Sequence, residues 1–180
     1  PYCPPFMPAV TISPSLIHGL GVCAARGFAS GESILVINDS RQVNPDHPLR
    51  PELGETESHC DQIAAGVVVL LQSPERYLNH SCQPNAYVKT LRGRRHVISL
   101  IPIQAGDEIT LDYSLNRHGQ ESWPCQCGSP ECRGQVPGSF FDLPHTQQLR
   151  SLALLESWFC HEHPERIAAL RQENGHNLRI

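Results

Sequence analysis

The sequence predicts a mainly β fold, of the β-rich α+β class, in which helices are confined to the C-terminal end. Sixteen prolines and thirteen glycines are spread through the 180 residues instead of being collected into one tract. Frequent turn residues of this kind favour many short strands over long helices. Leucine and aromatic residues recur at helical spacing only after Pro144. A chain of this length can bury one good core, so we expect a single domain with a small appendage.

Short apolar runs between turn residues predict the strands, since Val and Ile suit a pleated surface. Turns are expected at residues 18–21, 28–32, 92–93 and 105–107. The expected strands or strand pieces are residues 10–12, 16–17, 22–25, 33–37, 62–72, 86–89, 96–101 and 108–113. In the run 64–71, which is apolar throughout, periodicity alone does not separate a buried strand from a helix, and we favour a strand.

Two segments depart from this strand pattern. Residues 38–60 lose all periodicity and contain three prolines, which predicts an exposed insertion. After Pro144, residues 145–160 carry an apolar stripe at helical spacing, and residues 164–173 are expected to form another helix. The stripe is interpreted as a packing face, so this tail is expected to cover the core.

The composition argues against nucleic acid and membranes as direct partners. The formal net charge is −4 and the sequence pI is about 6.2, so no long-range attraction to a phosphate backbone is expected. A stretch of about twenty apolar residues is missing, and residues 1–10 lack the basic start and apolar core of a signal peptide. We therefore expect a soluble, intracellular protein.

Three of the eight cysteines, Cys125, Cys127 and Cys132, lie in one tight loop that also contains glycine and proline. Thiolates at this spacing can wrap a tetrahedral metal, but a structural zinc needs one more ligand from elsewhere. A Cys-x-Cys pair is badly placed to bridge itself as a disulfide. Four cysteines share no spacing and are interpreted as ordinary semi-buried thiols: Cys3, Cys23, Cys60 and Cys160.

The segment Arg76–Asn85 places two polar residues, Asn79 and His80, inside an otherwise structural passage. Taken alone, this pair favours a turn with a satisfied core histidine. Its meaning changes when it is considered together with three other motifs.

Four motifs, in the same order along the chain, resemble the SET-domain protein-lysine methyltransferases that carry a post-SET zinc loop. They are Gly19-Leu20-Gly21, the segment Arg76–Asn85 with its Asn-His-Ser-Cys core, the segment Gly106–Tyr113 ending in Asp-Tyr, and Cys125-x-Cys127-x4-Cys132. A lone glycine pair is weak, but four ordered matches over residues 17–132 are specific. The resemblance implies a SET β-fold of short sheets with a pseudoknot at residues 10–114. A post-SET zinc loop at 123–137 and a C-terminal helical extension at 145–180 are expected to follow.

The resemblance also implies that S-adenosylmethionine is the cofactor. Glycines let a backbone approach a ligand closely. Main-chain groups are therefore expected to line the methionine and ribose part of the cofactor at His18, Gly19, Leu20 and Gly21. In the family, the residues that match Asn79 and His80 lie against the adenine, and Gln126 in the zinc loop is a further expected contact. Trp123 has two interpretations, either as a cover for the adenine or as an anchor for the loop.

By the same resemblance, Cys82 joins Cys125, Cys127 and Cys132 around one structural zinc ion. A site of this kind contributes about 10–16 kcal/mol of binding free energy in small peptides, enough to order a loop that has little core of its own. The loop is expected to fold over the cofactor and complete the pocket.

Tyr113 is expected to be the catalytic residue. Methyl transfer from a sulfonium is an in-line displacement that needs an aligned, neutral amine. Lysine has a pKa near 10.4, so keeping it neutral at pH 7 costs about 4 to 5 kcal/mol, which a dry channel beside the sulfonium charge helps to supply. The Tyr113 hydroxyl is expected to orient the amine and Tyr87 to line the lysine channel, while Tyr77 is interpreted as an aromatic residue of the core.

The sequence departs from the family around the substrate groove. Residues 35–40 and 64–75 differ from the usual segments there, and the insertion is short. The leading hypothesis is a methyltransferase that acts on a lysine of a protein or peptide. A small-molecule methyltransferase on the same scaffold and a non-catalytic SET-derived interaction module are the alternatives, although intact Asn79, His80 and Tyr113 argue against the last.

Overall fold

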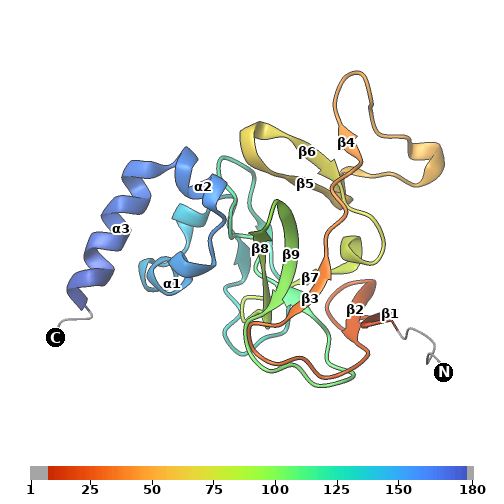
Figure 1. Cartoon of the computed structure of the whole chain (residues 1–180), viewed down its shortest axis with the longest axis horizontal. Coiled ribbons are helices and arrows are strands. Elements are labelled where there is room, and N and C mark those ends of the chain that lie inside the picture. Colours follow the sequence, from red (N-terminus) through yellow and green to blue (C-terminus); the bar gives the residue numbers. More distant parts are fainter. Residues whose placement is uncertain (1–7, 178–180) are drawn as a thin grey trace.

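The structure is a computed structural model, which describes residues 8–177. It consists mostly of short strands, with α-helices near the C-terminal end (Figure 1), so the predicted β-rich class is confirmed. Within the described residues, no helix is long and apolar enough to cross a membrane.

The first element is an antiparallel hairpin of β1 (Val10–Pro14) and β2 (Leu20–Ala24). Gly19 in the connecting turn has a φ of +49°, which glycine adopts without strain. The predicted strand piece at residues 16–17 is wrong, because these residues belong to the turn. There the backbone N–H groups of Ile17 and His18 donate to the Ser15 hydroxyl oxygen instead of to a neighbouring strand.

The central sheet has the strand order β3 (Ser33–Val36), β9 (Arg94–Ser99) and β8 (Ala86–Leu91). Arg92 and Gly93 connect β8 to β9 with φ values of +50° and +76°, the geometry of a tight hairpin turn. The strands and the turn predicted here are confirmed. Apolar side chains of this sheet join those of β2 in one buried cluster, which includes Val22, Phe28, Ile34, Val97 and Ile109.

The insertion forms a small sheet with the order β4 (Gln42–Val43), β6 (Val68–Leu70) and β5 (Cys60–Gln62). It stands at the top of the molecule in Figure 1. The strand predicted at 62–72 is confirmed only in part: residues 68–70 form β6, but a 3-10 turn at Ala64–Gly66 separates it from β5. Ala65 and Gly66 both have positive φ there, so the chain reverses between β5 and β6.

Arg95 fastens the insertion to the central sheet. Its buried guanidinium donates to both carboxylate oxygens of Asp39, at 2.6 and 2.9 Å, and to Asp61 of β5 at 2.5 Å. Charged donors paired with carboxylates in this way make strong hydrogen bonds. The position of β5 therefore depends on a side chain of β9.

The strand β7 (Asn79–His80) pairs in parallel with β10 (Thr110–Leu111). Asn85 extends this contact beyond the strands, since its side-chain amide donates to the Glu108 carbonyl at 2.8 Å and its oxygen accepts from the Thr110 N–H at 2.9 Å. Two motifs that are about thirty residues apart in the sequence thus lie side by side. The pseudoknot implied by the family resemblance is compatible with this pairing and stays a prediction.

After β10, the chain forms a two-stranded ribbon and then the helices. The ribbon pairs β11 (Trp123–Pro124) with β12 (Gln135–Val136) and encloses the cysteine loop. The helices are α1 (His145–Ser151), α2 (Ser157–Glu162) and α3 (Pro164–Asn177), and they lie beside β8 in Figure 1.

The single helix predicted at 145–160 is broken, because Leu155 and Glu156 are extended. Their backbone groups find partners outside a helix: Glu156 N–H donates to Asn116 at 2.7 Å, and the Leu155 carbonyl accepts from Lys89 of β8. The apolar stripe is a packing face as predicted. It packs into a cluster of its own with Phe140, however, and meets the strand region at the edge of β8.

Replacing Asn85 with alanine is expected to lower the free energy of unfolding by about 2–3 kcal/mol, because two hydrogen bonds are lost and their backbone partners stay partly buried. Urea denaturation of the variant measures this loss. Gln83→Ala, at an exposed neighbouring position, serves as the control. Equal unfolding midpoints for the two variants would contradict the structural role given to Asn85.

Candidate functional site

A cavity of about 850 Å³ opens between four parts of the chain. They are the turn at residues 15–20 between β1 and β2, called the glycine turn below, the small sheet of β4–β6, the β7–β10 pair and the cysteine loop. Most of the residues singled out in the sequence contribute to its wall, although they come from five separate parts of the chain. They are His18, Gly19, Leu20, Asn79, His80, Tyr87, Tyr113 and Gln126. The fold therefore gathers nearly the whole predicted set into one place.

Gly21 lies apart from the cavity wall, in the buried part of β2. A Cβ atom at this position would lie 2.3 Å from the Oε1 atom of Glu108. The need for glycine here therefore comes from the close approach of a carboxylate, a reason that the sequence does not reveal.

The side chain of Asn79 is hydrogen-bonded to the main chain of the glycine turn. Its side-chain nitrogen lies 3.2 Å from the His18 carbonyl oxygen, 2.9 Å from that of Leu20 and 2.8 Å from Glu108 Oε1. The residue is 9% exposed. Its amide thus contacts the main chain of the turn that forms one wall of the cavity.

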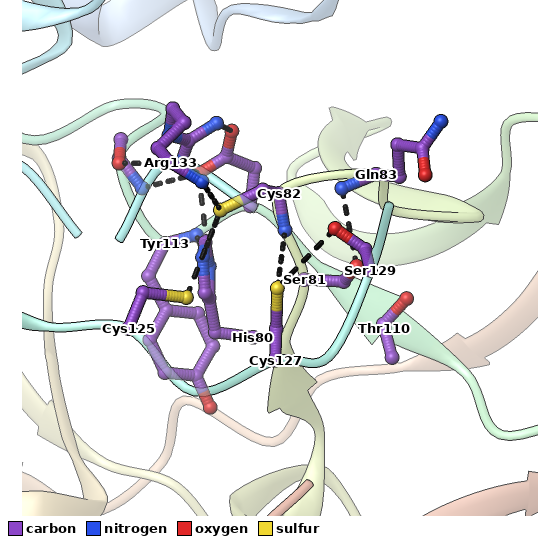
Figure 2. Close-up of polar contacts among 12 residues, drawn as sticks. His80, Ser81, Cys82, Gln83, Thr110, Tyr113, Cys125, Cys127, Ser129 and Arg133 are labelled. Atoms are coloured by element: carbon purple, nitrogen blue, oxygen red, sulfur yellow. Dashed lines mark hydrogen bonds and ion pairs between the residues drawn. The ribbon is translucent and has the colours of Figure 1, made fainter. Parts of the chain in front are cut away.

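His80 is a neutral imidazole that bonds on both sides. Its Nδ1 atom accepts from the Tyr113 N–H at 3.1 Å, so the ring proton is on Nε2, which lies 3.4 Å from the Cys82 sulfur (Figure 2). Burial lowers the pKa of His80 to about 4, and nearby Asp112 only partly opposes this effect. His80 is therefore both a buried histidine with its hydrogen bonds satisfied and a residue of the cavity wall.

Tyr113 lines the cavity and packs its ring between two others. The ring centroids of His80 and Trp123 lie 5.4 and 6.5 Å from its own. Its hydroxyl donates to the carbonyl oxygen of buried Leu78. Burial raises the pKa of the phenol to about 12, with Asp61 and Glu108 acting in the same direction, so Tyr113 is neutral near pH 7.

Four sulfur atoms gather beside His80, from Cys82, Cys125, Cys127 and Cys132, and all lie within 4.8 Å of one another. The Cys82 and Cys125 sulfurs are 3.7 Å apart. Four thiolates about 2.3 Å from a tetrahedral zinc would be separated by about 3.8 Å, so the donor set fits this metal. Backbone N–H groups of Cys82 and Arg133 point at sulfur atoms of the cluster, at 3.5 and 3.4 Å (Figure 2).

Arg133 connects the cysteine loop to the strand end that carries Tyr113. Its guanidinium makes two hydrogen bonds of 2.8 Å to the two carboxylate oxygens of Asp112, and both side chains are less than 10% exposed. Such a planar, bidentate pair fixes orientation as well as distance.

Several residues of the cavity wall were not predicted from the sequence. Arg117 places its guanidinium 4.4 Å from the centre of the Trp123 ring. Asp61 reaches the cavity from β5, and Glu156 reaches it from the C-terminal segment. None of them belongs to a motif, and only tertiary structure brings them there. Trp123 lines the cavity and also lies in β11, where it pairs with Val136 of the ribbon that encloses the cysteine loop.

Three of the four remaining cysteines have the partial burial that was predicted for them. Cys23, Cys60 and Cys160 are partly buried free thiols outside the four-sulfur cluster. Cys3 lies outside the described residues. Tyr77 packs against the main apolar cluster, as expected of a core aromatic residue, but it is only partly buried and also lines the cavity.

Comparison with known proteins identifies the family. The SET domain family model matches residues 19–114, more than half of the chain, and the chain therefore belongs to the SET-domain family. The resemblance to the SET domain is thus confirmed, while the cysteine motif at residues 125–132 lies outside the matched range.

Individual relatives are similar over shorter stretches. A Debaryomyces hansenii histone-lysine N-methyltransferase, H3 lysine-36 specific, is 51% identical over 61 residues, which are 32% of this chain and 8% of that protein. The Drosophila melanogaster histone-lysine N-methyltransferase Set2 is 43% identical over 67 residues, 35% of this chain and 3% of that protein. The chain thus spans less than a tenth of the length of these curated relatives.

A solved structure of a Plasmodium falciparum protein, named as a histone methyltransferase, matches at 24% identity with a TM-score of 0.47. The match covers 60% of this chain and 95% of that one.

Elemental analysis of the purified protein is expected to find one zinc ion per chain. Cys127→Ser is expected to lose most of it, because three thiolates remain of a four-ligand site. Cys160→Ser, a partly buried thiol outside the cluster, is the matched control and is expected to keep its zinc. Stoichiometric, chelator-resistant zinc in Cys127→Ser would show that the cluster is assigned wrongly.

Proposed function

We propose that this chain is a methyltransferase that uses S-adenosylmethionine to methylate the side-chain amine of a lysine in a protein. The observation that carries the proposal is the β7–β10 pairing, which places Asn79, His80 and Tyr113 at one cavity with the glycine turn. Membership of the SET-domain family and the names of the relatives support the reaction class.

We assign the cofactor to the part of the cavity between the glycine turn and β7. His18, Gly19 and Leu20 of the turn contribute to its wall, as do Asn79 and His80 of β7 and Gln126 of the cysteine loop. Gly21 is better explained as a packing residue behind the turn. When bound, S-adenosylmethionine supplies the electrophilic methyl group and a positive charge beside it.

Tyr113 is proposed to hold the lysine amine. Its hydroxyl proton is directed to the Leu78 carbonyl, so the lone pairs of the phenol oxygen are free to accept an N–H of the incoming amine. This contact turns the nitrogen lone pair away from the tyrosine and toward the reacting methyl group. A neutral phenol serves here as an orienting group, because its pKa of about 12 makes it a poor base at pH 7.

The lysine must arrive neutral, which costs about 4.6 kcal/mol at pH 7 for a free side chain with a pKa of 10.4. Apolar and aromatic walls disfavour the ammonium form, and Tyr87 of β8 is proposed as one of these walls.

We propose that zinc binds Cys82, Cys125, Cys127 and Cys132 and fixes the loop that carries Gln126 and Trp123 against the cavity. Residues 10–114 would then act as the SET domain, 123–137 as the zinc loop and 145–180 as a helical extension.

Incubation with radiolabelled S-adenosylmethionine tests the proposed function. Histone H3 and a peptide around its lysine 36 are the first substrates to try, because two relatives are named for histone-lysine methylation and one for this lysine. Transfer to a protein lysine supports the proposal. Cofactor binding with transfer only to small amines, or folded protein with no cofactor binding, would favour one of the two alternatives.

Tyr113→Phe is expected to keep the fold and cofactor affinity but to slow methyl transfer about a hundredfold, or about 2.7 kcal/mol, by analogy with the loss of one preorganised hydrogen-bonding group. Single-turnover kinetics at saturating cofactor measure this step. Tyr77→Phe removes the same oxygen from another tyrosine of the cavity wall, one that packs against the main apolar cluster, and this control is expected to keep the wild-type rate. Wild-type rates in Tyr113→Phe would assign the residue a structural role.

The pH dependence of the rate follows from the two pKa values. Raising the pH from 7 toward 10 deprotonates free lysine, so the rate with peptide substrate is expected to rise by up to tenfold per unit. Tyr113 stays neutral over this range because its raised pKa is about 12. A pH–rate profile with a falling limb below pH 10 that disappears in Tyr113→Phe would contradict the neutral phenol.

A further inference from the structure

Glu108 is a carboxylate behind the cavity at which two side chains from distant parts of the chain meet. Both of its oxygens lie 2.9 Å from the Ser15 hydroxyl, and its Oε1 atom lies 2.8 Å from the amide nitrogen of Asn79. An ionised carboxylate is an acceptor only, so both partners donate to it. Hydrogen bonds to a charged acceptor are about twice as strong as neutral ones.

Ser15 carries this interaction into the glycine turn. Its hydroxyl donates a hydrogen bond to Glu108. The hydroxyl oxygen in turn accepts hydrogen bonds from the backbone N–H groups of Ile17, at 2.9 Å, and His18, at 3.3 Å. Its own N–H donates to the Gly19 carbonyl at 3.0 Å. The N-terminal side of the turn is thereby fixed.

Asn79 fixes the same turn from the other side. The amide group that reaches Glu108 also lies within hydrogen-bonding distance of the carbonyl oxygens of His18 and Leu20. The main-chain groups of the turn are therefore held by two side chains, and both of these side chains end on Glu108.

The space for this carboxylate is provided by Gly21. A Cβ atom there would lie 2.3 Å from Glu108 Oε1, 2.7 Å from its Cδ and 3.1 Å from the Ser15 Cβ. A side chain at position 21 would therefore push Glu108 away from Ser15. The glycine in the motif and the glutamate in a motif more than eighty residues later depend on each other.

Glu108 itself lies apart from the residues that form the cavity wall, whereas residues 17–20 belong to that wall. We propose that Glu108 is a positioning residue: through Ser15 and Asn79 it sets the shape of the turn at residues 15–20, and thereby the affinity of the chain for S-adenosylmethionine. This inference rests on the proposed function for its cofactor. Its effect on the shape of the turn can be measured without any cofactor.

Glu108→Gln tests the proposal, because it keeps the size of the side chain but replaces one acceptor oxygen with a donor. Calorimetry with S-adenosylhomocysteine, the demethylated product, is expected to show at least a tenfold weaker affinity. The KM for S-adenosylmethionine should rise similarly. The KM for the peptide, the rate at saturating cofactor and the zinc content should stay within about twofold. Glu52→Gln, an exposed carboxylate in the insertion, is the control.

Ser15 supplies an independent pair of variants should Glu108→Gln fold poorly. Ser15→Ala removes the hydroxyl and is expected to weaken cofactor binding as Glu108→Gln does, while Ser15→Thr retains the hydroxyl and should restore most of it. Because the contact with Ser15 is one of the two through which Glu108 acts, the double variant Ser15→Ala/Glu108→Gln should lose little more than Glu108→Gln alone.

Amide hydrogen exchange separates this inference from the proposed function. The N–H groups of Ile17 and His18 are expected to exchange faster in Ser15→Ala and Glu108→Gln than in the wild type, with or without cofactor. If the wild type binds no cofactor but these amides respond, the proposed function fails and the positioning of the turn stands. Unchanged affinity and exchange in both variants, or an equal loss of cofactor, peptide and zinc binding, would overturn the proposal.

Discussion

The parallel contact between β7 and β10 is the constraint on which the rest of the site depends. It involves only two residues of each strand, with Thr110 opposite Asn79 and Leu111 opposite His80. The Asn85 side chain and the hydrogen bond from Ser81 N–H to the Leu111 carbonyl at 2.9 Å extend it. This contact sets the mutual positions of Asn79, Cys82 and Tyr113, because all three lie in it or within two residues of it.

Buried polar groups then transmit this geometry to the cysteine loop. The neutral ring of His80 bridges the Tyr113 backbone and the Cys82 sulfur, and Arg133 links the loop to Asp112, next to Tyr113. Buried ion pairs add little net stability, since their desolvation cost offsets their attraction, but breaking one leaves a buried charge unpaired. Here the Arg133–Asp112 pair fixes orientation, because it holds the cysteine loop at the end of β10, next to Tyr113.

The sequence predicts those parts of the molecule that local rules control. The β8–β9 hairpin follows from β-branched runs around Arg92-Gly93, and three members of the four-sulfur cluster follow from their spacing. Cys82 and the roles proposed around the cavity needed the family resemblance. Tertiary contacts decide the rest. The break at Leu155–Glu156 exists because Asn116 and Lys89 bond the backbone there, and the requirement for glycine at position 21 comes from Glu108. A sequence pattern does not encode such distant partners.

The separate apolar cluster of the C-terminal helices has a consequence for cooperativity. In the described part of the chain, its members pack around Phe140 and Phe159. Polar contacts tie the segment to Lys89 and Thr90 of β8, and Glu162 accepts from the Ala65 N–H between β5 and β6. Two more contacts join it to Asn116 and to Arg133. Clusters joined by so few bonds are expected to open as separate units, with the smaller one costing less free energy than global unfolding. Since Glu156 and Trp158 belong to this unit and also line the cavity, one wall of the site can loosen while the strands stay intact.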